Sequence, residues 1–399
     1  MSAAEVLRAR IERLSLAIEH HKQVIKDLES SKCNARRELN RILDPMARLP
    51  LEISSEIFIR CLPDSPRPHS GEAPLLFLPI CRLWADIAIV TPSLWTSIRC
   101  ESIPDAVNLD IWLQRARSLP LCISAHGKLV PDVANVLSKH AHRLQVFESE
   151  FHHFKQLITP FPLLAKLTVV GVMRDRIPPH EYLDILRAAP ALVECHFIST
   201  LFYPRDAEPL RHPRLRVNGT TSINAAYMFK YLTLPALSTL FIAGLDFVSG
   251  EFTAFLTKSV PPLQFLRIVI TELDDHALNQ SLRLVPTVTD LRIQFRDSTI
   301  DPFLLLEASV LTSNANPDPT LPNLCDLRIE LFFTHNVDYD AVIAALSTRR
   351  AAASCEKLQS FTLISENPAP DPDTIATLRQ FAADSGMRIR VGTRSCNYI

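Results

Sequence analysis

A short pattern, P-x-L-x-x-L-x-I or a close variant, recurs along most of the chain and constrains its fold more than any other feature. It occurs in FPLLAKLTV (161–169), APALVECHF (189–197), LPALSTLFI (234–242), VPPLQFLRI (260–268), VPTVTDLRI (285–293), LPNLCDLRI (321–329) and CEKLQSFTL (355–363). Alternating apolar positions at the end of each unit predict a short β-strand with one buried face. Helix-like runs such as HEYLDILRAAP (180–190) lie between units, so strands and helices should alternate.

The spacing of the units indicates a stacked repeat. Counting from Pro162, successive unit prolines are 28, 45, 26, 25 and 36 residues apart, and the longest gap leaves room for a degraded unit near HPRLRV (212–217). This period falls mostly in the leucine-rich-repeat range, and L-x-x-L-x-L is the strand core of that repeat. The asparagine or cysteine that usually follows the strand is missing. We therefore expect an irregular, leucine-rich-repeat-like α/β solenoid over 151–399, with 99–150 as a connecting segment that contains a strand at LPLCISA (119–125).

Residues 1–43 carry a heptad pattern that predicts one long helix. The positions in its seam are Leu7, Ile11, Leu14, Ile18, His21, Ile25, Leu28, Lys32, Ala35, Leu39 and Ile42. Such a seam pairs with another helix, either in a coiled-coil homodimer or by folding back on the chain itself, and the pattern leaves both open. The dipeptide Asp44-Pro45 should end the helix.

Residues 47–98 form a second all-α segment. Two apolar runs, LPLEISSEIFIRCLP (49–63) and LLFLPICRLWADIAIV (75–90), flank a loop of turn-forming residues, DSPRPHSGEAP (64–74). Both runs repeat apolar residues at helical spacing, and Pro79 should lie in the first turn of the second helix. A segment this short cannot bury all of these side chains by itself. The excess predicts either a partner surface or a surface covered by the repeats.

This segment resembles a known family. LPLEISSEIF (49–58), PICRLWADIA (79–88) and TPSLW (91–95) are similar to the F-box, whose common form runs L-P-x-E-[IL]-x-x-x-[IL]-[FL], then [VI]-C-[KR]-x-W. The matching positions are Leu49, Pro50, Glu52, Ile53, Ile57, Phe58, Ile80, Cys81, Arg82 and Trp84. A heptad helix before the motif and TP-LW after it resemble the arrangement in fungal F-box proteins. The lengthened loop 64–74 departs from the common form and leaves the spacing of the two helices open.

The resemblance implies partners and a role. F-box helices dock on a Skp-type adaptor, which joins them to a cullin and a RING subunit in a ubiquitin ligase of the SCF type. The domain after the F-box then selects the protein substrate. By this likeness the adaptor-binding or box-organising residues are Leu49, Pro50, Ile53, Ile57, Phe58, Leu62, Cys81 and Trp84. A protein of this kind is not an enzyme, because it acts by raising the concentration of substrate near the transferring enzyme.

Composition argues against several other classes. The net charge of −1 favours neither nucleic acid nor a membrane surface. No apolar run reaches the roughly eighteen residues of a transmembrane helix, and no apolar signal core stands at the N-terminus. Only 8 glycines accompany 30 prolines, and without a glycine-rich phosphate loop we expect no nucleotide cofactor. The nine cysteines are scattered without a C-x-x-C pair, which indicates free thiols in the cytoplasm or nucleus.

Two histidine pairs raise the question of a metal site. They are His20-His21 and His152-His153, and no cysteine stands near either pair. Adjacent side chains on a helix point about 100° apart and do not readily share one ion. We therefore expect solvent-exposed or packed histidines and no metal.

Arginine recurs at one position of three units. Arg267, Arg292 and Arg328 each stand in the sequence LRI. If the strands align, these arginines would form a basic row that suits an acidic or phosphorylated peptide of a substrate. The alternative is that outward strand positions are merely polar.

Three hypotheses of function follow. The first is the substrate-recognition subunit of an SCF-type ubiquitin ligase. The second is an F-box and repeat scaffold that acts outside a ligase and binds the adaptor without cullin. The third is a solenoid hydrolase or transferase, which requires a cluster of titratable residues in one pocket that the sequence does not reveal.

Overall fold

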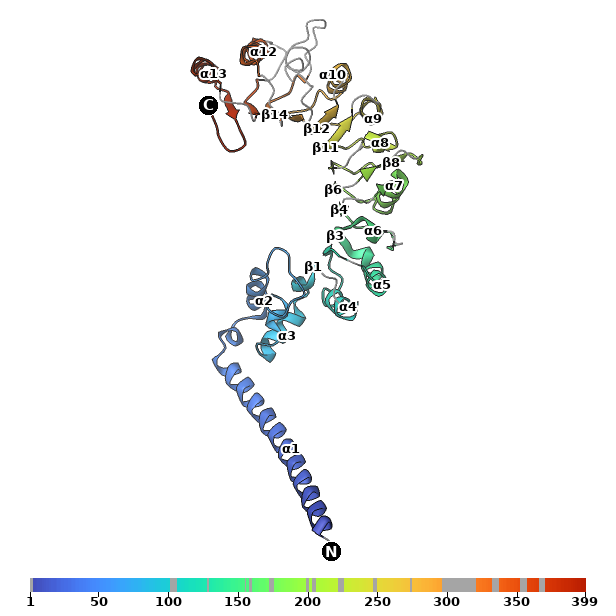
Figure 1. Cartoon of the computed structure of the whole chain (residues 1–399), viewed down its shortest axis with the longest axis vertical. Coiled ribbons are helices and arrows are strands. Elements are labelled where there is room, and N and C mark those ends of the chain that lie inside the picture. The colour runs from blue at the N-terminus through green and yellow to red at the C-terminus, as the bar shows by residue number, and fades with distance from the viewer. Residues whose placement is uncertain are drawn as a thin grey trace. The chain divides into compact units, whose positions relative to one another are not determined.

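The computed structural model divides the chain into two compact units (Figure 1). The first comprises Met1–Cys100 and Pro104–Leu121, and the second Glu101–Ile103 and Cys122–Ile399. The fold class is mixed α/β, with an N-terminal helix and a large parallel sheet. None of the described helices is long and apolar enough to cross a membrane. The structure describes residues 3–399 except 101–105, 128, 155, 158–159, 172–175, 199–200, 203–205, 222–225, 247–249, 273–274, 296–320, 332–336, 352–356 and 366–369.

Helix α1 (Ala3–Leu43) is the predicted heptad helix. It ends directly before Asp44-Pro45, as expected, because a proline disfavours helical backbone in the residue before it. The Asp44 carboxylate then accepts a hydrogen bond from the Met46 amide at 2.9 Å and caps the short 3₁₀ helix η1 (Pro45–Arg48). All the seam residues predicted from the heptad pattern are solvent-exposed on α1. No other part of the described chain therefore packs over the seam.

The predicted second segment contains two α-helices and two 3₁₀ turns. They are α2 (Leu51–Arg60), η2 (Leu75–Phe77), α3 (Arg82–Val90) and η3 (Pro92–Trp95). Helix α2 begins directly after Pro50. The expectation that Pro79 lies in the first turn of the second helix is wrong. Cys81 has extended backbone (φ −159°, ψ 168°), so α3 starts only at Arg82 and Pro79 lies in the turn before it.

Two tryptophan side chains pack against each other in the core of the first unit. Trp95 is fully buried, and its indole donates a hydrogen bond to the Ala88 carbonyl at 2.8 Å. It packs edge-on against Trp112 of helix α4 (Ala106–Arg115) at 5.1 Å between ring centroids, and the Arg115 guanidinium lies 4.4 Å over its ring. Strand β1 (Ser97–Cys100) follows η3 and contributes the buried Ile98 and Cys100. These contacts tie the end of the predicted box to the helix that follows it.

The second unit is built on strands that neighbour one another in chain order. The order is β2-β3-β4-β6-β9-β11-β12-β13-β14-β15-β16, and every printed pairing from β3 to β16 is parallel. The strands are β2 (Leu121–Ala125), β3 (Leu144–Glu150), β4 (Lys166–Val170), β6 (Glu194–Ile198), β9 (Val217–Thr220), β11 (Thr239–Asp246), β12 (Phe265–Glu272), β13 (Asp290–Phe295), β14 (Asp326–Leu331), β15 (Ser360–Ser365) and β16 (Arg388–Gly392).

Each predicted repeat unit supplies one of these strands. The units of the recurrent pattern become β4, β6, β11, β12, β13, β14 and β15, and the degraded unit near 212–217 leads into β9. The strand expected in LPLCISA is β2. Strands β3 and β16 were not singled out, because neither LQVFESE nor RIRVG completes the L-x-x-L-x-I run, or a close variant of it, that the units share.

Helices connect the strands along one side of the sheet (Figure 1). They are α5 (Pro131–His140), the 3₁₀ turn η4 (Ala141–Arg143), α6 (Phe151–Phe154), α7 (Pro179–Ala188), α8 (Ala226–Phe229), α9 (Glu251–Ser259), α10 (Asp275–Arg283), α12 (Tyr339–Ala351) and α13 (Pro372–Ser385). Two small parallel pairs accompany them, β5 (Arg176–Ile177) with β7 (Leu201–Phe202) and β8 (Leu210–Arg211) with β10 (Leu232–Thr233).

The sheet has one buried and one open face. In β14, Leu327, Ile329 and Leu331 are buried, whereas Arg328 and Glu330 alternate with them and are partly exposed. Register carries this alternation from strand to strand, so that large aliphatic residues form continuous buried rows under the helices. Each such side chain stabilises the fold by about 1.5–3 kcal/mol. We call the opposite surface of β3 to β16 the open face.

Candidate functional site

An aromatic cluster forms the centre of the predicted box. The Phe58 ring stacks on Phe77 at 4.2 Å between centroids and lies 5.0 Å from the Trp84 ring. Phe58 is only 1% exposed, so it holds α2 against η2 and α3. Phe58 therefore organises the predicted box from within. It offers no surface for a direct contact with an adaptor.

Asp44 links the end of α1 to the box, a role that sequence reasoning missed. The Trp84 indole donates to one carboxylate oxygen at 2.6 Å, and the Cys81 thiol donates to the same oxygen at 3.7 Å. The other oxygen caps η1. Two residues expected in the adaptor site, Cys81 and Trp84, thus converge on one carboxylate. An aspartate before a proline is an N-cap pattern that could have signalled part of this arrangement.

The remaining predicted adaptor residues include an exposed apolar stripe. Leu49, Ile53 and Ile57 are spaced four residues apart, and their exposed fractions are 39%, 50% and 38%. Along α2 this spacing places Ile53 and Ile57 on one face, with Leu49 just before the helix. Pro50 is also exposed, whereas Leu62, Cys81 and Trp84 are partly buried. Leu49, Ile53 and Ile57 are called the α2 stripe below.

More apolar side chains of the first unit face solvent. Leu51, Leu76, Ile80, Ile89 and Val90 are between 40% and 50% exposed. Single exposed aliphatic residues are common on proteins, whereas a contiguous group of them is typical of an interaction surface. The first unit therefore combines a well-packed aromatic centre with an apolar exterior.

The lengthened loop between the helices is packed against the unit. Pro66, Ala73 and Pro74 are buried, and the Pro66 carbonyl accepts a hydrogen bond from the Arg99 amide at 2.7 Å. The side chains of Ser55 and Thr91 share a hydrogen bond of 2.8 Å that joins α2 to the start of η3. The insertion thus leaves the two helices in direct contact through Phe58 and Trp84.

On the open face, the three predicted arginines lie in one row. Register pairs Arg267 of β12 with Arg292 of β13, and Arg292 with Arg328 of β14. All three are partly exposed. The Arg267 guanidinium lies 4.8 Å over the Phe241 ring of β11, and that of Arg292 lies 4.9 Å over Phe265. The alignment is as predicted, and the role of the row in substrate binding stays a prediction.

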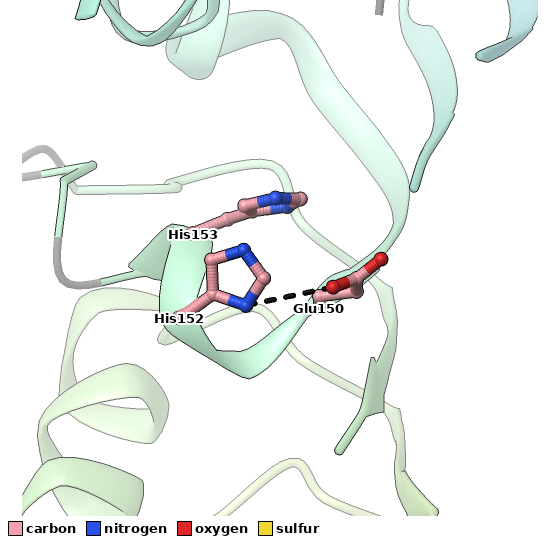
Figure 2. Close-up of side chains that lie close together, drawn as sticks. All are labelled: Glu150, His152 and His153. Carbon is pink, nitrogen blue, oxygen red and sulfur yellow. Dashed lines mark ion pairs between the residues drawn. The ribbon is translucent and has the colours of Figure 1, made fainter. Parts of the chain in front are cut away.

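The histidine pair of α6 lies beside Glu150, as Figure 2 shows. The ligand atoms of Glu150, His152 and His153 all lie within 4.8 Å of one another. His153, however, is fully buried and both of its ring nitrogens are engaged. Nε2 donates to the Gly127 carbonyl at 2.6 Å, which leaves Nδ1 to accept from the Ser149 hydroxyl at 2.7 Å. This histidine is a packed core residue whose bonds would have to break before it could bind an ion.

Two buried histidines make the second unit sensitive to acid. Burial lowers the pKa of His153 and of His212, and a nearby Arg214 lowers the pKa of His212 further. Because the unfolded chain binds a proton more readily, their neutral forms stabilise the fold above about pH 6.5. We expect this stability to fall as the pH drops below that value, by at most about 1.4 kcal/mol per pH unit for each histidine.

Urea unfolding followed by far-UV circular dichroism at pH 7.5 and 5.5 measures this loss. His153→Gln retains a donor for Gly127 but does not titrate, so the variant should lose less stability than wild type over the same interval. An equal loss in both proteins would contradict a contribution from His153.

The thiols of Cys100 and Cys195 are buried and unreactive. Burial raises the pKa of Cys100 to about 12 and also raises the pKa of Cys195. A nucleophilic cysteine needs a lowered pKa and access to solvent, and these two have neither. The cysteines in the described part of the chain are all free.

Comparisons with known proteins give one distant likeness. No protein-family model matches the sequence, and no curated protein matches it. Fourteen chains of solved structures match the fold. One belongs to the crystal structure of the Rad7 and Elc1 complex in yeast; it is 11% identical with a TM-score of 0.37, over 98% of this chain and 93% of that chain. A likeness at this level assigns no family and no function.

Proposed function

We propose that this chain is an F-box protein of the fungal type and the substrate-recognition subunit of an SCF-type ubiquitin ligase. The observation that carries the proposal is the α2 stripe, three exposed aliphatic side chains at helical spacing beside a closed aromatic core. The same residues carry the F-box motif. A Skp-type adaptor is the partner whose docking would remove this apolar surface from water.

In this proposal the second unit is an irregular leucine-rich-repeat-like solenoid that holds a protein substrate on its open face. The parallel strands in chain order and the helices on one side support that architecture. The protein is not an enzyme itself and works in the cytoplasm or nucleus. It acts by placing substrate and ubiquitin-transferring enzyme on one scaffold, which includes the adaptor and a cullin. An F-box scaffold without cullin is the second candidate, since the α2 stripe supports adaptor binding alone equally well.

Helix α1 supports a parallel homodimer within the same proposal. The heptad register places Ile11, Ile18 and Ile25 at a positions and Leu7, Leu14 and Leu28 at d positions, all of them exposed. Isoleucine at a with leucine at d favours two parallel strands, and a single lysine at a, here Lys32, fixes the register. The occupant of the α1 seam is then a second copy of α1.

Ile18→Asp should convert the dimer into a monomer, because it buries a charge in the apolar seam. Leu16→Asp is the matched control, since Leu16 is 67% exposed on the outer face of the same helix. Light scattering coupled to size-exclusion chromatography should give about twice the chain mass of 44.9 kDa for wild type and for the control. A monomeric wild type at tens of micromolar would rule the dimer out.

A further inference from the structure

The open face changes chemical character from one end of the sheet to the other. One register row runs Glu148, Thr168, His196, Gly219, Phe241, Arg267, Arg292, Arg328, Thr362 and Arg390. Its β3 end carries carboxylates that pair with histidines, as in Glu148 with His126 at 3.5 Å. Its β12 to β16 end is cationic and contains aromatic rings. A ligand of the cationic end therefore needs negative charge.

Aromatic rings hold two of these arginines in place. Phe241 lies under the Arg267 guanidinium, and Phe265 lies under that of Arg292. A ring contact uses the flat face of the guanidinium and leaves its N–H edges free to bind an anion. Because the planar group is already oriented, less rotamer freedom is lost when a ligand binds.

The three arginines differ in whether a carboxylate already pairs with the guanidinium group. Arg292 donates to both Asp290 oxygens at 3.2 and 3.1 Å, and Arg328 pairs with Glu330 at 2.7 Å. Arg267 has no acidic partner among the described residues, and its contact is the Phe241 ring. Of the three aligned arginines Arg267, Arg292 and Arg328, only Arg267 therefore has no carboxylate partner among the described residues, and it lies beside Arg292, whose carboxylate can be exchanged.

This arrangement of arginines favours a phosphate group over a carboxylate. Neighbouring strands are about 4.8 Å apart, so Arg267 and Arg292 can flank a single anionic group. An incoming carboxylate would only replace the one that Arg292 already holds. A phosphate monoester carries a charge of about −1.5 to −2 and three acceptor oxygens, so it can bind both guanidinium groups at once.

The same pattern disfavours a nucleic acid. Asp290, Asp326 and Glu330 stand on the open face beside the arginines. A polyanion gains affinity by contacting many phosphates, and these carboxylates would repel most of them. A short segment with one phosphate avoids that cost.

We propose that Arg267 and Arg292, oriented by Phe241 and Phe265, form a binding site for one phosphorylated side chain of a peptide. The proposed function is needed only to identify that peptide as part of a substrate. Its chemistry depends on the second unit alone, so it can be tested without an adaptor.

The probe is a degenerate heptapeptide library with a central phosphoserine, used with the full-length chain. Matched libraries carry serine or glutamate at the centre. Retention on immobilised wild-type protein should be about tenfold higher for the phosphoserine library than for the glutamate library, and should weaken with salt. Arg267→Gln and Arg292→Gln should each remove most of this preference, because each removes one guanidinium group and keeps a polar, uncharged side chain.

Arg214→Gln is the control, because Arg214 is an exposed arginine of the same unit outside the row. It should bind like wild type, and circular dichroism should show the same fold for every variant. Equal retention of the three libraries, or a phosphoserine preference that survives both row variants, would overturn the site. Equally strong binding of a mixed-sequence single-stranded oligonucleotide would overturn it too, by showing a general polyanion surface. Adaptor binding in the same variants is measured separately, so failure of the site and failure of the F-box proposal remain distinct.

Discussion

Ile57→Asp is expected to abolish co-purification of this chain with a fungal Skp-type adaptor. Ile57 is an exposed residue of the α2 stripe, four residues from Ile53 on the same face of α2. In the complex an aspartate there would be buried without a partner, which costs several kcal/mol. If the α2 stripe is the docking surface, this substitution should weaken binding by at least about thirty-fold, or about 2 kcal/mol.

A matched control separates loss of the interface from loss of the fold. Val260→Asp makes the same change from β-branched to acidic in the second unit, at a residue that is 74% exposed. Val260 has a positive φ of 42°, a backbone region that aspartate tolerates better than valine, so the control should fold well. It should bind the adaptor like wild type. Binding that survives Ile57→Asp, or a folded wild type that never binds, would refute docking through the α2 stripe.

Adding a cullin to the same experiment distinguishes the two candidate functions. A ligase receptor should form a complex of chain, adaptor and cullin, and that complex should depend on Ile57. A scaffold outside the ligase should bind the adaptor and exclude the cullin. Analytical gel filtration of the mixed components gives the composition of the complex directly.

The repeat strands could be predicted because their chemistry is local. A proline before an L-x-x-L-x-I run stops the preceding helix, and the alternating apolar residues then specify a strand with one buried face. This reasoning found β4, β6 and β11 to β14 and placed a weak unit before β9, and the apolar alternation alone found β15. It missed β3 and β16, whose residues alternate between buried and exposed but do not complete the L-x-x-L-x-I run.

The arginine row could be predicted for the same reason. Equal positions in equal units lie side by side when parallel strands pair in register, as Arg292 and Arg328 do. The aromatic partners were visible in the same alignment of units, since Phe241 occupies in LPALSTLFI the position of Arg267 in VPPLQFLRI. What sequence could not give is the ring-over-guanidinium geometry, which depends on side-chain rotamers and sheet twist.

The box was predicted less completely because its contacts are tertiary. Helical spacing identified Ile53 and Ile57 on one face of α2, but it could not tell that Phe58 turns inward to meet Phe77. The hydrogen bond between Asp44 and Trp84 joins residues 40 positions apart, so no local pattern signals it. Likewise, the extended backbone at Cys81 delays the start of α3 although the apolar spacing continues through Ile80.

Phe58→Ala should destabilise the first unit by about 3–5 kcal/mol, because it removes a fully buried ring and leaves a cavity between α2, η2 and α3. Ile53→Ala is the control from the same helix. Ile53 is half exposed, so its truncation should cost no more than about 0.5 kcal/mol. The contrast tests whether Phe58 organises the box from within while Ile53 faces outward.

Tryptophan fluorescence isolates the unit in which this change acts. All three tryptophans, Trp84, Trp95 and Trp112, lie in the first unit, so their emission during urea unfolding follows that unit alone. Far-UV circular dichroism follows the helices of both units and the sheet of the second, so the part of its transition that comes from the second unit should stay unchanged in Phe58→Ala. If the fluorescence midpoint also stays at its wild-type value, Phe58 does not hold the box together, and the α2 stripe then loses the rigid support that adaptor docking requires.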